Sequence, residues 1–271
     1  MPVNDDLGCR MKENYEMRAR TYLTRRTPVA IRIDGKAFHT FTKNFQKPFD
    51  PIFMTAMQNT MKRLCENIQG CVFGYTQSDE ITLILIDYQN LNSDAWFDYQ
   101  VQKMCSVAAS MATLYFNQEL IASKAMYEME RKSGLVPQSM EEQENDMKYL
   151  SDVTFAICKG ATFDARCFNV PKEEVANLIY WRQLDAIRNS IQSCGQAKYS
   201  PKQLHEASCI VIKEMLRQDG YEWDNLPLYM QRGSACYKGS NGWALDLNMP
   251  ILKGISREYV DKFIYVGEEE R

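Results

Sequence analysis

The sequence predicts an α+β fold built on a ferredoxin-type βαββαβ core, with an antiparallel sheet and additional helices. Short β-branched runs and helix-spaced apolar runs follow one another in the order strand, helix, strand, strand, helix, strand. A polar turn joins the two middle strands directly, as in a hairpin. The 271 residues, 45% of them hydrophobic, suffice for a sizeable core. We predict a single domain over residues 1–271, with the core at about 28–170 and a helical C-terminal portion at about 171–271.

The first strand and the first long helix carry clear boundary signals. The run "PVAIRID" at residues 28–34 is rich in β-branched residues and leads into Gly35, which predicts a buried strand followed by a tight turn. Asp50 stands before Pro51, the pairing expected at a helix N-cap and first helical position. Apolar residues then recur at helical spacing until Gly70, so we predict a helix between these residues.

The remaining elements follow from the same kinds of pattern. Hairpin strands are predicted at 71–75 and 81–86, with an acidic turn holding Asp79 and Glu80 between them. After the hairpin we predict, in chain order, a helix at about 94–118, an irregular acidic stretch at about 123–149, a strand at 162–170 and a helix that begins at Pro171.

The two turn acids have an ordinary explanation, because hairpin turns favour polar residues. The topology offers a second one. In the ferredoxin-type arrangement the third strand lies antiparallel between the first two, so the hairpin tip lies at the sheet edge where the first strand ends. Asp34 and Asp79 are then expected to meet at this edge, with Glu80 beside them.

Such a group of acids has a chemical use. Carboxylates at a strand end, together with the Gly35 carbonyl, form a hard oxygen site suited to Mg²⁺. Two such ions about 3.5 to 4 Å apart hold the attacking and leaving oxygens in phosphoryl transfer. This is a palm-like site, of the kind shared by polymerases and nucleotide cyclases.

Composition argues against several classes of protein. No apolar run approaches the roughly 20 residues of a membrane helix, and the N-terminal residues show no signal or transit pattern, so we predict a cytoplasmic protein without a membrane partner. Nine cysteines without a CxxC pair, and only two histidines, argue against zinc and disulfides and favour reduced thiols. The net charge of −3 argues against a general nucleic-acid coat.

Cations nevertheless gather near the N-terminus. Between residues 17 and 36 the single acid Asp34 stands among six cations: Arg18, Arg20, Arg25, Arg26, Arg32 and Lys36. Two interpretations are open: a solvated helix and loop, or a strip beside the active site that contacts RNA phosphates. Under the second interpretation, RNA binding is assigned to Arg18, Arg20, Arg25 and Arg26.

Four motifs in register resemble one family. The stretches "RIDGKAFHTF", "KPFD", "YTQSDEITLIL" and "WRQLDAIRNSI" are similar to those of the tRNA(His) guanylyltransferase superfamily, above all its bacterial, archaeal and phage guanylyltransferase-like branch. The resemblance covers about residues 7–238. It implies a palm-like, homotetrameric nucleotidyltransferase that uses GTP, ATP and other nucleoside triphosphates to extend tRNA in the 3′-to-5′ direction. A triphosphate activates the 5′ end, and the 3′-hydroxyl of an incoming nucleotide then attacks it.

The resemblance also implies the site residues. Asp34, Gly35 through its carbonyl, and Asp79 match the ligands of two Mg²⁺ ions, and Glu80 matches an auxiliary catalytic acid. The nucleotide-binding positions implied are Asp34, Gly35, Lys36, Ala37, Phe38, His39, Lys47, Asp50, Ser78 and Asp79. For two of these a plainer interpretation stays open: Lys47 as a solvated loop cation, and Asp50 as a helix cap.

One departure from the family pattern bears on the reaction. The eukaryotic enzymes carry "HINNLYN" after their "WRQ" motif, whereas this chain has Ile187 at the position of the histidine. The altered element favours template-dependent repair of 5′-shortened tRNA over addition of a single G to tRNA(His).

Arg182 has two interpretations, a salt-bridge partner or an RNA ligand.

Two further function classes remain as alternatives. A nucleotide cyclase would share the metal site and need no RNA. A non-catalytic RNA-binding module would need exposed aromatic residues on its central strands, and "VAIRID" and "ITLILI" lack them.

Overall fold

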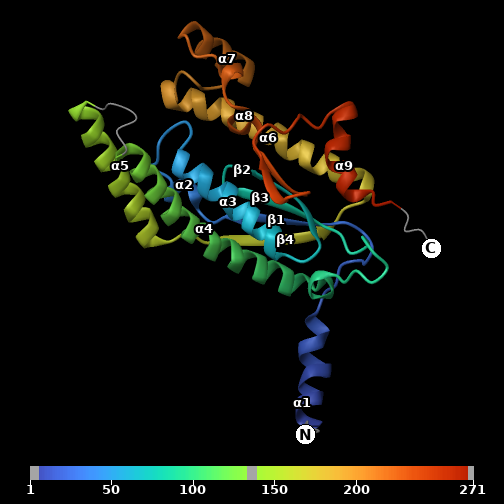
Figure 1. Cartoon of the computed structure of the whole chain (residues 1–271). Coiled ribbons are helices and arrows are strands. Elements are labelled where there is room, and N and C mark those ends of the chain that lie inside the picture. The colour runs from blue at the N-terminus through green and yellow to red at the C-terminus, as the bar shows by residue number, and fades with distance from the viewer. Residues whose placement is uncertain (1–5, 133–138, 268–271) are drawn as a thin grey trace.

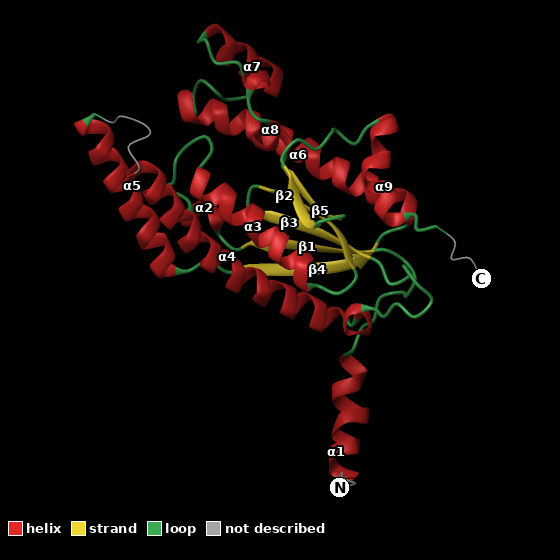
Figure 2. Ribbon diagram, in the orientation of Figure 1, coloured by secondary structure: helices red, strands yellow, loops and turns green. Residues whose placement is uncertain are grey.

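The computed structural model describes residues 6–132 and 139–267 and has an α+β architecture around one six-stranded sheet. The strand order is β4-β1-β3-β2-β5-β6, and neighbouring strands are antiparallel throughout. Figure 2 shows the sheet with helices on both sides. The predicted α+β class is confirmed.

The strands place β3 between β1 and β2, as the ferredoxin-type arrangement requires. Their bounds are β1 Val29–Gly35, β2 Cys71–Gln77, β3 Glu80–Leu85, β4 Phe163–Asn169, β5 Ser234–Gly239 and β6 Gly242–Asp246. Because β3 is antiparallel to both neighbours, β1 and β2 run parallel, and the β2–β3 tip lies where β1 ends.

Helices cover both faces of the sheet (Figure 1). The α-helices are α1 Asp6–Met11, α2 Phe38–Phe41, α3 Pro51–Asn67, α4 Val101–Lys132, α5 Met140–Lys159, α6 Lys172–Lys198, α7 Cys209–Gln218, α8 Leu228–Arg232 and α9 Glu258–Ile264. Shorter 3₁₀ or π segments are η1 Lys12–Glu16, η2 Met17–Ala19, η3 Trp96–Tyr99, η4 Trp223–Asn225 and η5 Gly254–Arg257. One core cluster joins α3 and α4 to the sheet, and a second joins α6 and α9 to its other face.

The start of α3 agrees with its sequence signals. The Asp50 carboxylate accepts a hydrogen bond from the Phe53 N–H at 2.8 Å, and Pro51 opens the helix. The buried face of α3 includes Met57, Met61 and Leu64, which pack under the sheet. Capping and apolar spacing therefore act together here.

Two predictions between residues 94 and 149 are wrong. The predicted helix at 94–118 begins later, at Val101, because the preceding backbone turns through positive φ angles at Phe97, Asp98 and Tyr99. It then continues to Lys132, so the end of α4 and the start of α5 occupy residues 123–132 and 140–149 of the stretch predicted to be irregular. Met, Glu and Lys are strong helix formers, so the acidic composition of this stretch did not prevent helix formation.

The C-terminal portion adds strands as well as helices. β5 pairs with β2 and β6 pairs with β5, so residues from both predicted portions share one sheet. We propose on this basis that the chain folds as a single domain. In the described part of the chain, no helix is both long and apolar enough to span a membrane. All nine cysteines are free thiols in the structure, and three of them, Cys65, Cys194 and Cys236, are buried.

Candidate active site

Two carboxylates meet at the end of β1. The last pair of the β2–β3 hairpin is Gln77 with Glu80, so the turn consists only of Ser78 and Asp79. The Gly35 N–H donates to the Asp79 carbonyl oxygen at 3.1 Å, which ties the turn to the end of β1. The predicted juxtaposition of Asp34 and Asp79 at one sheet edge is therefore observed.

Neither carboxylate forms an ion pair with any residue that the structure describes. Burial raises the pKa of Asp34, and the charges of Glu80 and Asp164 raise it further. Burial likewise raises the pKa of Asp79, with a further contribution from the Asp34 charge, while the Ser78 hydroxyl donates to its carboxylate at 3.1 Å. The charges of Arg166 and Arg32 offset only part of this effect at Asp34. Two carboxylates side by side, neither of them in an ion pair, favour the binding of a cation.

The oxygen ligands available here fit an Mg²⁺ ion whose coordination is completed by substrate phosphates. No group of three or more His, Cys, Asp or Glu side chains arranged to hold a metal occurs in the residues that the structure describes. Mg²⁺ usually keeps water ligands and binds through one or two carboxylates plus substrate phosphates. Asp34 and Asp79, with the backbone oxygen of Gly35, match that pattern.

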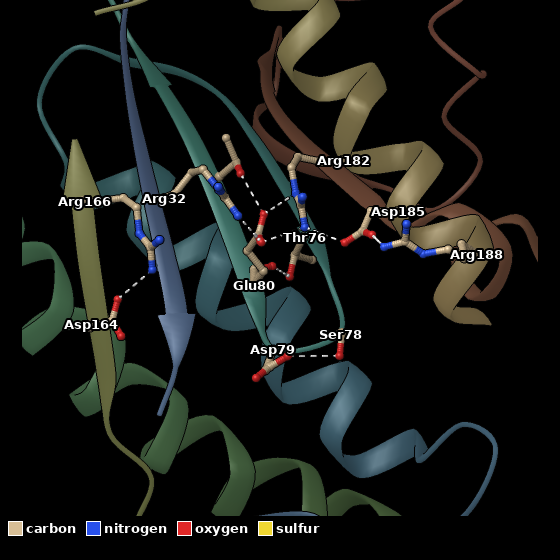
Figure 3. A network of polar contacts seen from close by, with 11 residues as sticks. Arg32, Thr76, Ser78, Asp79, Glu80, Asp164, Arg166, Arg182, Asp185 and Arg188 are labelled. Atoms are coloured by element: carbon tan, nitrogen blue, oxygen red, sulfur yellow. Dashed lines mark hydrogen bonds and ion pairs between the residues drawn. The ribbon is translucent and has the colours of Figure 1, made fainter. Parts of the chain in front are cut away.

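Glu80 lies outside the turn, contrary to the prediction, because it is the first residue of β3. Its buried carboxylate accepts from Arg182 Nε at 2.7 Å and Nη2 at 2.8 Å, and from Arg32 Nη2 at 2.6 Å (Figure 3). Two guanidinium groups thus compensate the charge of Glu80. The salt-bridge interpretation of Arg182 is confirmed.

The segment after β1 offers backbone donors to an anion. Ala37 has a φ of 57°, and no described atom accepts from the N–H groups of Ala37, Phe38 and His39. A Cβ at Gly35 would lie 2.2 Å from the Phe38 ring, so glycine is required for this close approach. The Phe38 side chain is buried, and Phe38 can contribute only its backbone. Lys36 and His39 are exposed beside it.

A cavity of about 140 Å³ brings Ser78 and Asp50 together. Its other walls include the side chains of Phe49, Phe53, Asn189, Ser193 and Tyr229. The Asp50 carboxylate is already occupied, because it accepts from the Phe53 N–H, the Gln46 N–H at 2.9 Å and the Tyr149 hydroxyl at 2.7 Å. Burial raises its pKa. Asp50 therefore acts at least as a helix cap, whereas Lys47 is exposed with its Nζ 3.5 Å from the Thr42 carbonyl oxygen.

The four N-terminal arginines do not lie beside the carboxylates, and this prediction of place is wrong. Arg25 and Arg26 precede β1, whereas Asp34 is near its far end, and the path from Val29 to Asp34 alone spans roughly 17 Å. Arg18 and Arg20 belong to the segment that includes α1, which projects away from the sheet (Figure 1). Arg25 is also held by Asp87 at 2.7 Å and by Asp98 at 2.8 Å.

Comparisons with known proteins decide the family. The family model for tRNAHis guanylyltransferase matches residues 9–171, which is more than half of the chain. This chain belongs to that family. A bacterial tRNA(His) guanylyltransferase-like protein in complex with ATP is similar, with a TM-score of 0.78 and 36% identity over 96% of this chain and 99% of the other. One in complex with GTP has a TM-score of 0.72 and 34% identity, over 96% of this chain and 100% of the other.

Curated relatives agree with this result. The probable tRNA(His) guanylyltransferase of Dictyostelium discoideum is 25% identical over 224 residues, which are 78% of this chain and 75% of that protein. As a member of the guanylyltransferase family the chain is a nucleotidyltransferase. The family model covers β1 to β4, and with them both carboxylates, and it ends before α6.

Sequence reasoning missed several residues around the guanylyltransferase site. Asp164 and Arg166 on β4 stand opposite Asp34 and Arg32, and α6 contributes Asn189 to the cavity. A signal for the first two existed, because "FDARCFN" places both charges on one face of a predicted strand. No local signal placed α6 beside the hairpin.

Proposed function

We propose that this guanylyltransferase-family member is a template-dependent 3′-to-5′ RNA nucleotidyltransferase that repairs shortened 5′ ends of tRNA. Its substrates are tRNA together with GTP, ATP and other nucleoside triphosphates. The observation that carries the proposal is the pair Asp34 and Asp79, two carboxylates that form no ion pair with a described residue and lie next to a turn with free N–H donors. The relatives that hold ATP and GTP in their structures support it.

The residues of the site have separate tasks. Asp34, Asp79 and the Gly35 carbonyl would hold two Mg²⁺ ions, which when bound stabilise charge on the attacking and leaving oxygens. The N–H groups of residues 37–39 bind the triphosphate, as successive N–H groups in a turn commonly do. The cavity lined by Ser78 and Asp50 receives the base, with Ser78 between base and phosphates.

The chemistry has two steps. A 5′-phosphate oxygen of the RNA attacks the α-phosphorus of a nucleoside triphosphate, and pyrophosphate leaves. The 3′-hydroxyl of the incoming nucleotide then attacks the activated 5′-phosphate, and a nucleoside monophosphate leaves. An RNA that already carries a 5′-triphosphate omits the first step and releases pyrophosphate in the second.

The position of Ile187 favours repair over single G addition. Its side chain is partly buried and packs against an apolar cluster that includes Ile191 and Ile212. An isoleucine neither donates a hydrogen bond nor takes up a proton. A step that depends on histidine at this position is therefore weakened here, and base pairing with the opposing strand becomes the selector of the incoming nucleotide.

The test uses two shortened tRNAs that differ only in the base opposite the gap. Each is incubated with Mg²⁺, ATP and GTP, and the 5′ ends are sequenced. A tRNA with C opposite the gap should gain G, and one with U should gain A. Equal addition of G to both would contradict the repair proposal and support a tRNA(His) guanylyltransferase that adds one G. Turnover of GTP alone, without RNA, would indicate a nucleotide cyclase instead.

We further propose that the tRNA backbone extends to Arg18, Arg20, Arg25 and Arg26 at the far end of the sheet. A tRNA is long enough to contact both ends of a domain of this size.

We also propose a homotetramer, supported by exposed apolar side chains along α4 and α5, among them Leu114, Ile121, Met129 and Phe155. The molar mass measured by light scattering tests the assembly.

A further inference from the structure

An exposed tryptophan lies beside Arg32 and Arg182, the two arginines that bind Glu80. Trp181 on α6 leaves 52% of its surface accessible, whereas Trp96 and Trp223 are each 7% exposed. The guanidinium of Arg32 lies 5.3 Å from the centre of its ring, and that of Arg182 lies 4.5 Å away. Both guanidiniums are bound to Glu80. The ring is therefore held by fixed neighbours while half of its surface stays free.

Trp181 and Asp34 face the same side of the sheet. Side chains alternate along a strand, and Ala30 on β1 packs into the core cluster that includes α6. Arg32 and Asp34 therefore point to the α6 side as well. Their partners across the β1–β4 ladder are Arg166 and Asp164, both exposed. Trp181 thus lies next to an open face of the sheet, and this face extends to Asp34, one of the proposed catalytic carboxylates.

The same helix turns most of a different side to the nucleotide cavity. Trp181, Asp185 and Arg188 are spaced as one stripe along α6. Of the cavity-lining residues on α6, Ala186, Ser190 and Ser193 lie roughly 120° to 180° around the helix from Trp181, whereas Asn189, one turn after Asp185, lies at the border between the two sides. The two sides of α6 can accordingly serve two different molecules, a nucleoside triphosphate in the cavity and a second substrate on the Trp181 side.

We propose that Trp181 is an RNA-positioning residue on which the 5′-terminal base of the acceptor RNA stacks, so that its 5′-phosphate reaches the carboxylates. Proteins commonly bind unpaired bases on exposed aromatic rings, with adjacent guanidinium groups adding attraction. Stacking accepts any base, as repair of different 5′ ends requires. The acids on this face, Asp164 and Asp185, are each paired with an arginine. These ion pairs reduce the repulsion between the acids and an approaching backbone phosphate. This inference rests on the proposed function.

The test compares Trp181→Ala, Trp181→Phe and the matched control Leu184→Ala, an exposed apolar residue on the same helix. The KM for shortened tRNA and the KM for GTP are measured separately. Trp181→Ala should raise the KM for tRNA roughly ten- to a hundredfold and leave the KM for GTP unchanged. Trp181→Phe should restore most of the loss, and the control should resemble the unaltered protein. A general distortion of the site would raise both KM values, whereas loss of folded enzyme would lower the apparent kcat and change neither KM.

A binding measurement makes the result independent of turnover. Addition of tRNA should quench the fluorescence of Trp181 in the unaltered protein, and Trp181→Phe should lose that change. An unchanged KM for tRNA in Trp181→Ala, or an equal rise in both KM values, would overturn the inference about Trp181. As long as the unaltered protein adds nucleotides, the proposed function would stand. An unaltered protein that adds no nucleotide would overturn the proposed function, and the fluorescence measurement would still decide whether RNA stacks on Trp181.

Discussion

Glu80 and Arg182 form a two-pronged buried ion pair, with 2.7 Å from Nε to Oε1 and 2.8 Å from Nη2 to Oε2. The pair joins the first residue of β3 to α6, although the two residues are 102 positions apart in the sequence. Asp79 directly precedes Glu80, so this contact also fixes the turn that carries Asp79, one of the two proposed catalytic carboxylates. Figure 3 shows the pair between the hairpin and the helix.

Removing one partner should destabilise the fold. Glu80→Ala leaves Arg182 buried without its main counter-charge, and breaking a buried pair in this way costs about 3 to 5 kcal/mol. Denaturant unfolding should show the loss, whereas Glu214→Ala, in an exposed pair with Arg217, should cost less than about 1 kcal/mol. The rate of nucleotide addition should fall less than in Asp79→Ala. An unchanged unfolding midpoint in Glu80→Ala would contradict this view of the pair.

Loss of either carboxylate should abolish activity without weakening the fold. Asp34→Asn and Asp79→Asn remove a proposed ligand of both Mg²⁺ ions, so we expect the single-turnover rate to fall by several orders of magnitude. The folded state raises the pKa of both acids. Ionisation of these acids therefore lowers the free energy of unfolding. The loss grows as the pH rises from the ordinary pKa to the raised pKa, and it is complete above the raised pKa. The free energy of unfolding at pH 7 should stay constant or increase, and turnover close to normal in Asp79→Asn would refute the two-metal assignment.

The turn after β1 should tolerate no side chain at Gly35. Gly35→Ala drives a methyl group into the Phe38 ring and should cost about 1 to 3 kcal/mol, because overpacking shifts the backbone. The same shift should weaken Mg²⁺–ATP binding, measured by calorimetry. The matched control is Gly267→Ala, where a Cβ meets nothing within 4 Å. Equal ATP affinity in both variants would show that this turn does not hold the triphosphate.

The N-terminal cations should govern the salt dependence of tRNA binding. We expect a variant with Ala at Arg18, Arg20 and Arg26 to bind more weakly and to lose about one unit of log–log salt slope for each phosphate contact removed. Arg25 is left in place because it compensates the fully buried Asp87. Lys202→Ala removes an exposed cation elsewhere and serves as the control. If affinity and slope are unchanged, the segment is only a solvated surface.

The thiols should differ in reactivity. Burial, together with the neighbouring Cys105 thiol, raises the pKa of Cys167 to about 12. The thiolate is the reactive form, so Cys167 should react slowly with iodoacetamide at pH 8. Cys9 and Cys158 are exposed and should be alkylated first, as peptide mass spectrometry would show. Early labelling of Cys167 would contradict the packing of α4 against β4.

Local patterns of residue type were enough to predict several elements of the fold. The β-branched run before Gly35, the Asp50–Pro51 cap and the hairpin pattern each depend on neighbouring residues, and the structure confirms all three. The ferredoxin-type strand arrangement, with the third strand antiparallel between the first two, then sufficed to predict that Asp34 lies near Asp79. The four sequence motifs that predicted the family are local patterns too, and they lie in or next to these elements.

Packing between distant segments sets which charges are compensated and where the cations lie. Glu80 and Asp79 are adjacent acids in the sequence, yet the partners of Glu80 come from β1 and from α6, and Asp79 receives none among the described residues. Arg25 and Arg26 are within ten positions of Asp34, yet an extended strand places them at the opposite end of the sheet. Contacts between distant segments depend on packing and register, and no local pattern of residue types records them.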